Sequence, residues 1–112
     1  MKSFVYRLLY CVFNMGVHFE FLLFISESAV ALKIYISSVY NITKEKIQEI
    51  CQHIRSVLEK YNIVVGDVKA GFCWYTGRHV LFFELKNANN IKIDDLIKIR
   101  NEIQHILDTL LS

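Results

Sequence analysis

The sequence predicts an α+β protein in which a long apolar helix at the N-terminus precedes the order helix, strand, strand, helix. Three observations support this prediction: an apolar stretch without a strong turn signal, two later segments with helical periodicity, and a glycine-marked β-hairpin between those two segments. We expect two regions, an apolar one over residues 1–40 and a small α+β domain over residues 41–112.

The composition limits both the size of the core and the classes of partner. A chain of 112 residues supports one hydrophobic core, and a hydrophobic content of 54% points to a membrane or an obligate partner. The net charge of +2 and the lack of a basic run argue against nucleic acid as a partner. Three scattered cysteines without metal-ligand spacing argue against a disulfide framework, so we expect a reducing compartment.

The first 40 residues carry two competing patterns. The segment from Phe4 to Ile25 is apolar enough to resemble a membrane span, although Arg7 and Glu20 interrupt it. Between residues 18 and 38, strand-like alternation competes with helix-like spacing. Because Ser26–Ala29 has no Gly, Asn, Asp or Pro for a tight turn, we predict one continuous helix from Gly16 to Tyr40, roughly 36 Å long at 1.5 Å per residue.

The alternative fold is a duplicated ββα unit with a four-stranded antiparallel sheet, in which residues 18–38 form two strands. A shift of the chain against itself by 49 positions aligns the apolar positions of the two later helices, placing Ile47, Ile50, Ile54, Val57 and Leu58 on Leu96, Ile99, Ile103, Ile106 and Leu107. Any two amphipathic helices align on their apolar stripes, however, and the match outside the helices is poorer. The continuous helix is therefore preferred.

Two amphipathic helices are predicted on either side of the hairpin. The first follows Thr43, a favourable N-cap, with Ile42 placed to pack on Ile47, and it ends near Asn62, a favourable C-cap. The last helix has two acidic residues in its first turn, where negative charge suits the helix dipole, and an apolar stripe that ends at Leu110.

The segment from Val68 to Lys86 predicts a β-hairpin. With Gly77-Arg78 as a two-residue type II′ loop, Trp74 lies opposite Leu81 on an apolar face. We therefore expect Trp74 in the core, where its replacement by alanine would cost ~3–5 kcal/mol.

The other face of this hairpin is too apolar to be left in water. We expect a second copy of the chain to cover it. The predicted assembly is a homodimer, with an interface that includes Cys73, Tyr75, Val80 and Phe82.

No catalytic residue is predicted. The chain has no Gly-rich phosphate loop, no HExxH motif and no nucleophile in a recognisable context, so we do not expect an enzyme. The four histidines form no pair with metal-ligand spacing. Asp67 and His79 are the candidate metal ligands, in a site shared across the dimer.

The order of these elements resembles the end of a cation diffusion facilitator, a family of divalent-metal/proton antiporters. The resemblance rests on the apolar segment that leads into Glu27–Leu32, the helix from Thr43 to Tyr61, the Val68–Leu85 hairpin with its Gly77 turn and Phe82-Phe83-Glu84-Leu85 end, and the helix from Ile93 to Leu110. It implies a last transmembrane helix, followed by a ferredoxin-like cytoplasmic domain that dimerises and, in many members, binds zinc or related ions.

Two departures limit what the resemblance implies. The first five membrane helices and the last strand of the cytoplasmic domain have no counterpart in this sequence. We therefore expect a dimerisation or metal-responsive module held in a membrane, with its domain in the cytoplasm, and not a complete transporter. The alternative is a soluble, cytoplasmic ββα-repeat module for binding or assembly, with RNA as one candidate ligand. Residues 18–38 distinguish the two, since they form one helix in the first and two strands in the second.

Overall fold

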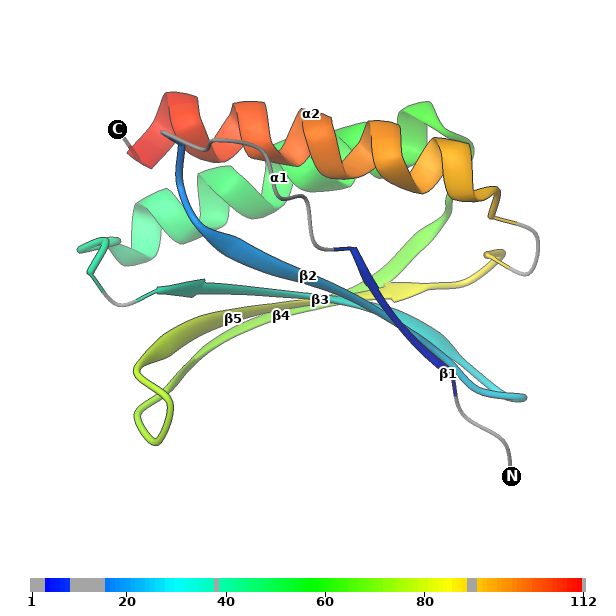
Figure 1. The fold of residues 1–112 in the computed structure, drawn as a ribbon, viewed down its shortest axis with the longest axis horizontal. Coiled ribbons are helices and arrows are strands. Elements are labelled where there is room, and N and C mark those ends of the chain that lie inside the picture. The colour runs from blue at the N-terminus through cyan, green and yellow to red at the C-terminus, as the bar shows by residue number, and fades with distance from the viewer. Residues whose placement is uncertain (1–3, 9–15, 38, 89–90, 112) are drawn as a thin grey trace.

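The computed structural model describes residues 4–8, 16–37, 39–88 and 91–111. Within these residues the chain forms five strands and two helices, in the order β1 (Phe4–Leu8), β2 (Phe19–Ile25), β3 (Val30–Ser37), α1 (Lys44–Lys60), β4 (Val65–Cys73), β5 (Arg78–Leu85) and α2 (Ile93–Leu111). Both helices lie on the same face of one sheet, so the molecule has two layers (Figure 1). The hydrophobic core lies between these layers.

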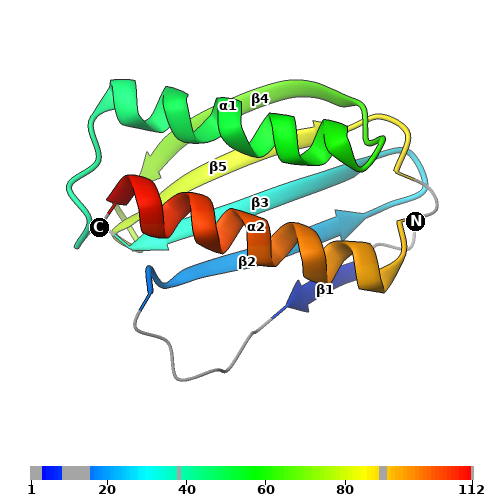
Figure 2. The same ribbon diagram turned by 90° about the horizontal axis from the view of Figure 1, so that it is seen from above.

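The described strands form a single sheet in the order β1-β2-β3-β5-β4, and each of the four pairings is antiparallel. Figure 2 shows the sheet from the helix side, with α1 lying along β4 and β5 and α2 crossing β2 and β3. The helices leave the opposite face of the sheet uncovered.

The predicted helix from Gly16 to Tyr40 is wrong, because residues 19–37 form the hairpin of β2 and β3. The turn between these strands does not need Gly or Pro. The Ser26 N–H donates to the Ala29 carbonyl at 2.9 Å, and the Ala29 N–H donates to the Ser26 hydroxyl at 3.1 Å. A serine side chain thus closes the turn that the sequence argument excluded.

Strand alternation prevails over helical spacing in this segment. Buried and half-buried side chains alternate along the whole of β3, and its core side comprises Val30, Leu32, Ile34 and Ile36. Among the described residues, no helix combines the length and apolar character needed to cross a membrane. Residues 9–15 of the predicted apolar stretch lie outside the described residues.

The alternative prediction of a repeated ββα unit is confirmed. The first unit is β2-β3-α1 and the second is β4-β5-α2, with β1 added at the edge beside β2. The central pairing of β3 with β5 places Lys33 opposite Phe82, two residues that are themselves 49 positions apart. The two units therefore meet at the centre of the sheet, where β3 of the first pairs with β5 of the second.

Each helix packs on the outer strand of the other unit. In α1, Arg55 donates to the Gly66 carbonyl in β4 at 3.1 Å. In α2, the Arg100 guanidinium lies 4.6 Å from the centroid of the Phe19 ring in β2. Beside it, Gln104 donates to the Val17 carbonyl at 2.8 Å. Because of this crossed packing, the two units share one core.

The predicted ends of the first helix are close to those observed. Thr43 is the N-cap of α1, and its hydroxyl accepts a hydrogen bond from the Lys46 N–H at 3.1 Å. The C-cap is Tyr61, one residue before the predicted Asn62. Asn62 has φ 62°, and the Ile63 N–H donates back to the helix, so Asn62 supplies the left-handed residue that ends α1.

The predicted hairpin in the second unit exists, but its register differs. Phe72 pairs with His79 and Ala70 pairs with Leu81. The strands are joined by a four-residue turn, Trp74–Gly77, in which Gly77 has φ 65° and donates to the Cys73 carbonyl at 2.8 Å. Trp74 therefore lies in the turn with 82% of its surface exposed, and its predicted core position is wrong.

Candidate functional site

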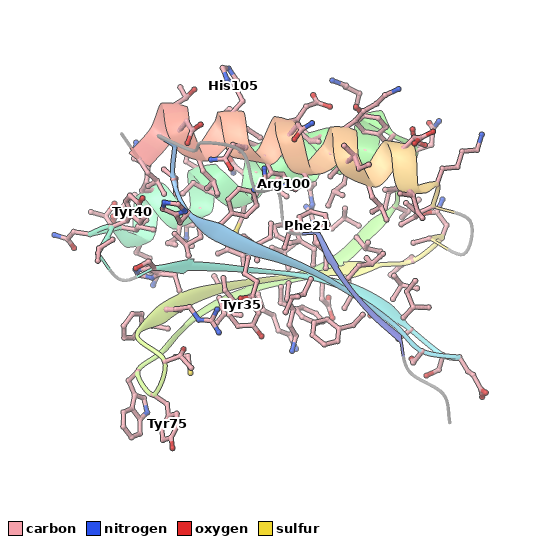
Figure 3. All side chains as sticks on the ribbon, in the orientation of Figure 1. Phe21, Tyr35, Tyr40, Tyr75, Arg100 and His105 are labelled. Atoms are coloured by element: carbon pink, nitrogen blue, oxygen red, sulfur yellow. The ribbon has the colours of Figure 1, made fainter. Side chains whose placement is uncertain are left out.

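The candidate site is the sheet face that the helices leave uncovered, which we call the open face. Figure 3 shows Tyr35 on this side of the sheet, whereas Phe21 and Arg100 lie on the helix side. Alternation along β2, β3, β4 and β5, with the observed register, assigns to the open face Glu20, Leu22, Phe24, Ala31, Lys33, Tyr35, Ser37, Lys69, Gly71, Cys73, Arg78, Val80, Phe82 and Glu84.

Long basic side chains lie over the aromatic rings of the open face. The Lys33 ammonium is 4.9 Å from the centroid of the Phe24 ring. The Arg78 guanidinium is 4.5 Å from the centroid of the Tyr35 ring, and Lys69 approaches Phe82 to 6.0 Å. Their aliphatic stems shield the rings while their charges remain hydrated. The shield consists of flexible chains, so a partner surface can displace it.

An ion pair links three strands on the open face. Glu20 on β2 and Arg78 on β5 approach to 3.1 Å, with Tyr35 of β3 beneath the guanidinium. Both charged side chains are at least two-thirds buried, which screens the pair from salt better than a fully exposed pair. Arg78 is thereby held flat on the sheet.

The charges of the open face nearly balance on β2 to β5. These four strands carry three cations there, Lys33, Lys69 and Arg78, and two carboxylates, Glu20 and Glu84. A nucleic-acid surface has a positive stripe that neutralises phosphates. This face differs, because it carries charges of both signs, an arrangement typical of contacts between proteins.

The structure brings together three of the four predicted interface residues. Cys73, Val80 and Phe82 lie on the open face, because the register differs from the predicted one by an even number of residues and so preserves the faces. The fourth, Tyr75, lies in the turn with 84% of its surface exposed.

The two predicted metal ligands lie at opposite ends of the β4–β5 hairpin. Asp67 is exposed beside the bulge in β4, and its N–H donates to Glu84 at 3.3 Å. His79 lies next to the turn, where its ring and that of Phe72 meet edge to face with their centroids 5.1 Å apart. The described residues contain no group of three or more His, Cys, Asp or Glu side chains arranged to hold a metal ion.

The two thiols in the described part of the chain differ in their environment. Burial raises the pKa of the half-buried Cys51 thiol in α1. Hydrogen bonding by Thr76 lowers the pKa of the Cys73 thiol next to the turn. Neither thiol belongs to a cluster that resembles a catalytic site.

The half of the open face that lies on β2 and β3 was not predicted from the sequence. Phe24, Lys33 and Tyr35 were assigned to a helix, on which they would not share a face with the second hairpin. The alternation of Leu32, Ile34 and Ile36 with polar or aromatic residues was the available signal.

Comparison with known proteins gives no match to the model of any protein family, to any curated protein or to any solved structure. The function therefore has to be inferred from the surface itself.

Proposed function

We propose that the chain is a non-catalytic assembly module that pairs with a second copy of itself through the open face. The observation that carries this proposal is the contrast between the two sides of the sheet. One side is covered by α1 and α2, whereas the other leaves apolar and aromatic residues only half-buried, among them Leu22, Phe24, Tyr35, Val80 and Phe82. A sheet face that remains in water is normally polar.

A second copy fits this face better than a polyanion does. In a two-fold dimer the same patch meets itself, so each surface must carry both members of every complementary pair. The open face does so, since it has apolar residues for the centre and both signs of charge around them. The carboxylates of Glu20 and Glu84 would repel the phosphates of RNA, which makes RNA the weaker candidate ligand.

The size of the face indicates a reversible dimer. Five strands, spaced ~4.8 Å apart and with about seven residues at ~3.3 Å each, cover roughly 24 by 23 Å. The flat area of the face is therefore roughly 550 Å², without the extra surface of the side chains. This is somewhat below the ~800 Å² per partner of a standard interface. We expect dissociation on dilution.

The assembly role is also better supported than the transporter-derived role. The latter needs residues 16–40 as the end of a membrane helix, and those residues include β2 and β3. These two strands instead supply half of the open face.

The test is the molar mass in solution, measured by light scattering over a range of protein concentrations. We expect the mass to rise toward two chains with concentration, and Phe82→Glu to remain at one chain with an unchanged circular dichroism spectrum. The matched control is Ile97→Glu, because Ile97 is an apolar residue of α2 that is 39% exposed and lies away from the open face. A wild-type chain that stays monomeric at every concentration, or a Phe82→Glu variant that dimerises like the wild type, would remove the proposal.

A further inference from the structure

The β4–β5 hairpin ends in an aromatic tip that packs on little else in the described chain. Phe72, Trp74 and Tyr75 are 52%, 82% and 84% exposed, respectively. The Trp74 and Tyr75 rings meet edge to face with their centroids 6.0 Å apart. In Figure 1 this tip extends below the sheet at the end where β4 and β5 bend away from the helices, and Figure 3 shows Tyr75 pointing outward from it.

The segment that forms the tip contains basic residues and no acidic residue. Residues 69–79 contain Lys69, Arg78 and His79 but no Asp or Glu. Arg78 is paired with Glu20 of β2, which offsets its charge, so the net positive charge behind the tip comes from Lys69, which extends over the Phe82 ring. This charge complements an anionic surface.

We infer that this tip docks on the headgroup layer of a bilayer that contains anionic lipid. Trp and Tyr have an apolar body with one polar group, and they concentrate where a bilayer meets water. A convex tip with adjacent rings can enter a soft headgroup layer, whereas a protein partner would need a matching pocket. Basic residues behind the rings would be attracted by the negative surface potential of such a membrane.

This contact requires no membrane-spanning helix, and it does not rest on the proposed dimer. The aromatic rings of the tip are not among the open-face residues, although Lys69 and Arg78 belong to the open face and also lie behind the tip. If the dimer also forms, two tips on one particle would strengthen attachment through effective concentration.

The chain supplies its own reporter, because Trp74 is the only tryptophan. The full chain would be mixed with vesicles of phosphatidylcholine alone or with added phosphatidylglycerol. With the anionic vesicles we expect the tryptophan emission to shift to shorter wavelength, to be protected from acrylamide and to be quenched by brominated lipid. Phosphatidylcholine alone should give a much smaller shift, and added salt should weaken binding to the anionic vesicles.

Variants separate the tip from the rest of the surface. Vesicle co-sedimentation should be lost in the double variant Trp74→Ser/Tyr75→Ser. It should be about fivefold weaker in Lys69→Gln, and it should be unchanged in the control Lys98→Gln, an exposed lysine of α2. Phe82→Glu separates the two proposals, because a monomer that still binds vesicles leaves the tip assignment intact.

Three results would overturn the inference. The first is an emission spectrum that neither vesicle changes. The second is co-sedimentation that survives the double variant, which would place the contact elsewhere. The third is a shift to shorter wavelength that depends on protein concentration without vesicles, which would assign the tip to a contact between proteins.

Discussion

The crossed packing of the helices predicts that a cavity made in either helix weakens both ββα units. Ile54 of α1 and Ile103 of α2 are 49 positions apart, and both are 0% exposed. Replacing Ile by Ala removes three carbon atoms, which at ~0.8 kcal/mol per buried methylene gives about 2.4 kcal/mol for transfer alone. The unfilled cavity raises the expected loss to about 3–4 kcal/mol for each variant. This is a large part of the roughly 5–15 kcal/mol that keeps a domain folded.

The assay has two readouts. Urea unfolding followed by circular dichroism gives the free energy of unfolding. Hydrogen exchange gives the protection of the β2–β3 amides and of the β4–β5 amides separately. For Ile103→Ala we expect both hairpins to lose protection by the same free energy, because α2 belongs to one unit by sequence and packs on the other.

The matched controls are Gln52→Ala and Asn101→Ala, which are exposed residues of α1 and α2 separated by the same 49 positions. Each should change stability by no more than ~0.5 kcal/mol. The reasoning would be refuted by a loss of protection confined to the unit that carries the substitution, or by two separate unfolding transitions. A cost below ~1 kcal/mol for both isoleucine variants would contradict their placement in the core.

Three further predictions concern single residues. Trp74→Ala should lower the free energy of urea unfolding by less than ~0.5 kcal/mol, since the residue is exposed in the turn; a loss of several kcal/mol would mean that Trp74 is packed. Asn62→Gly should be tolerated, whereas Asn62→Val should cost ~1–2 kcal/mol because φ is 62°, and equal urea midpoints would contradict the left-handed backbone. Hydrogen bonds from Lys60 and Tyr61 lower the pKa of Glu102, so its carboxylate adds stability that is lost as the pH falls through the folded pKa. The bond from Tyr61 raises that phenol's pKa to about 12, so its contribution is lost only as the pH rises through that value. Glu102→Gln should reduce the fall of Tm at both low and high pH. A Tm that depends on pH as in the wild type would disprove the contribution of this carboxylate.

The second half of the fold was predictable from the sequence because its signals are local. Thr43 has the chemistry of an N-cap, the helices have continuous apolar stripes, and a glycine marks the turn between β4 and β5. The first half was predicted wrongly because the choice between helix and strands depended on a single inference about the turn. The absence of Gly and Pro at Ser26–Ala29 was read as the absence of a turn, although a serine hydroxyl can close one.

The candidate site was predictable to the extent that it depends on alternation. Cys73, Val80 and Phe82 lie on the predicted face, since a register error of an even number of residues moves partners along a strand without turning side chains over. Trp74 was misplaced because its position depends on the length of the turn, which a single glycine does not determine. The contacts of Lys33 with Phe24 and of Arg78 with Tyr35 could not be foreseen, because Lys33 and both rings lie on strands that were assigned to a helix.

The two units of the repeat have chemically different turns, so the two ends of the sheet differ in character. The turn Ser26–Ala29 joins β2 to β3 and carries Glu27, whereas the turn Trp74–Gly77 joins β4 to β5 and carries the aromatic rings. The turns lie at opposite ends of the sheet (Figure 1). If the aromatic tip docks on a bilayer as inferred, the turn that carries Glu27 lies at the far end of the sheet from the membrane. The two units thus have the same order of strands and helix, but the side chains at the two ends of the sheet differ, so the ends are not interchangeable.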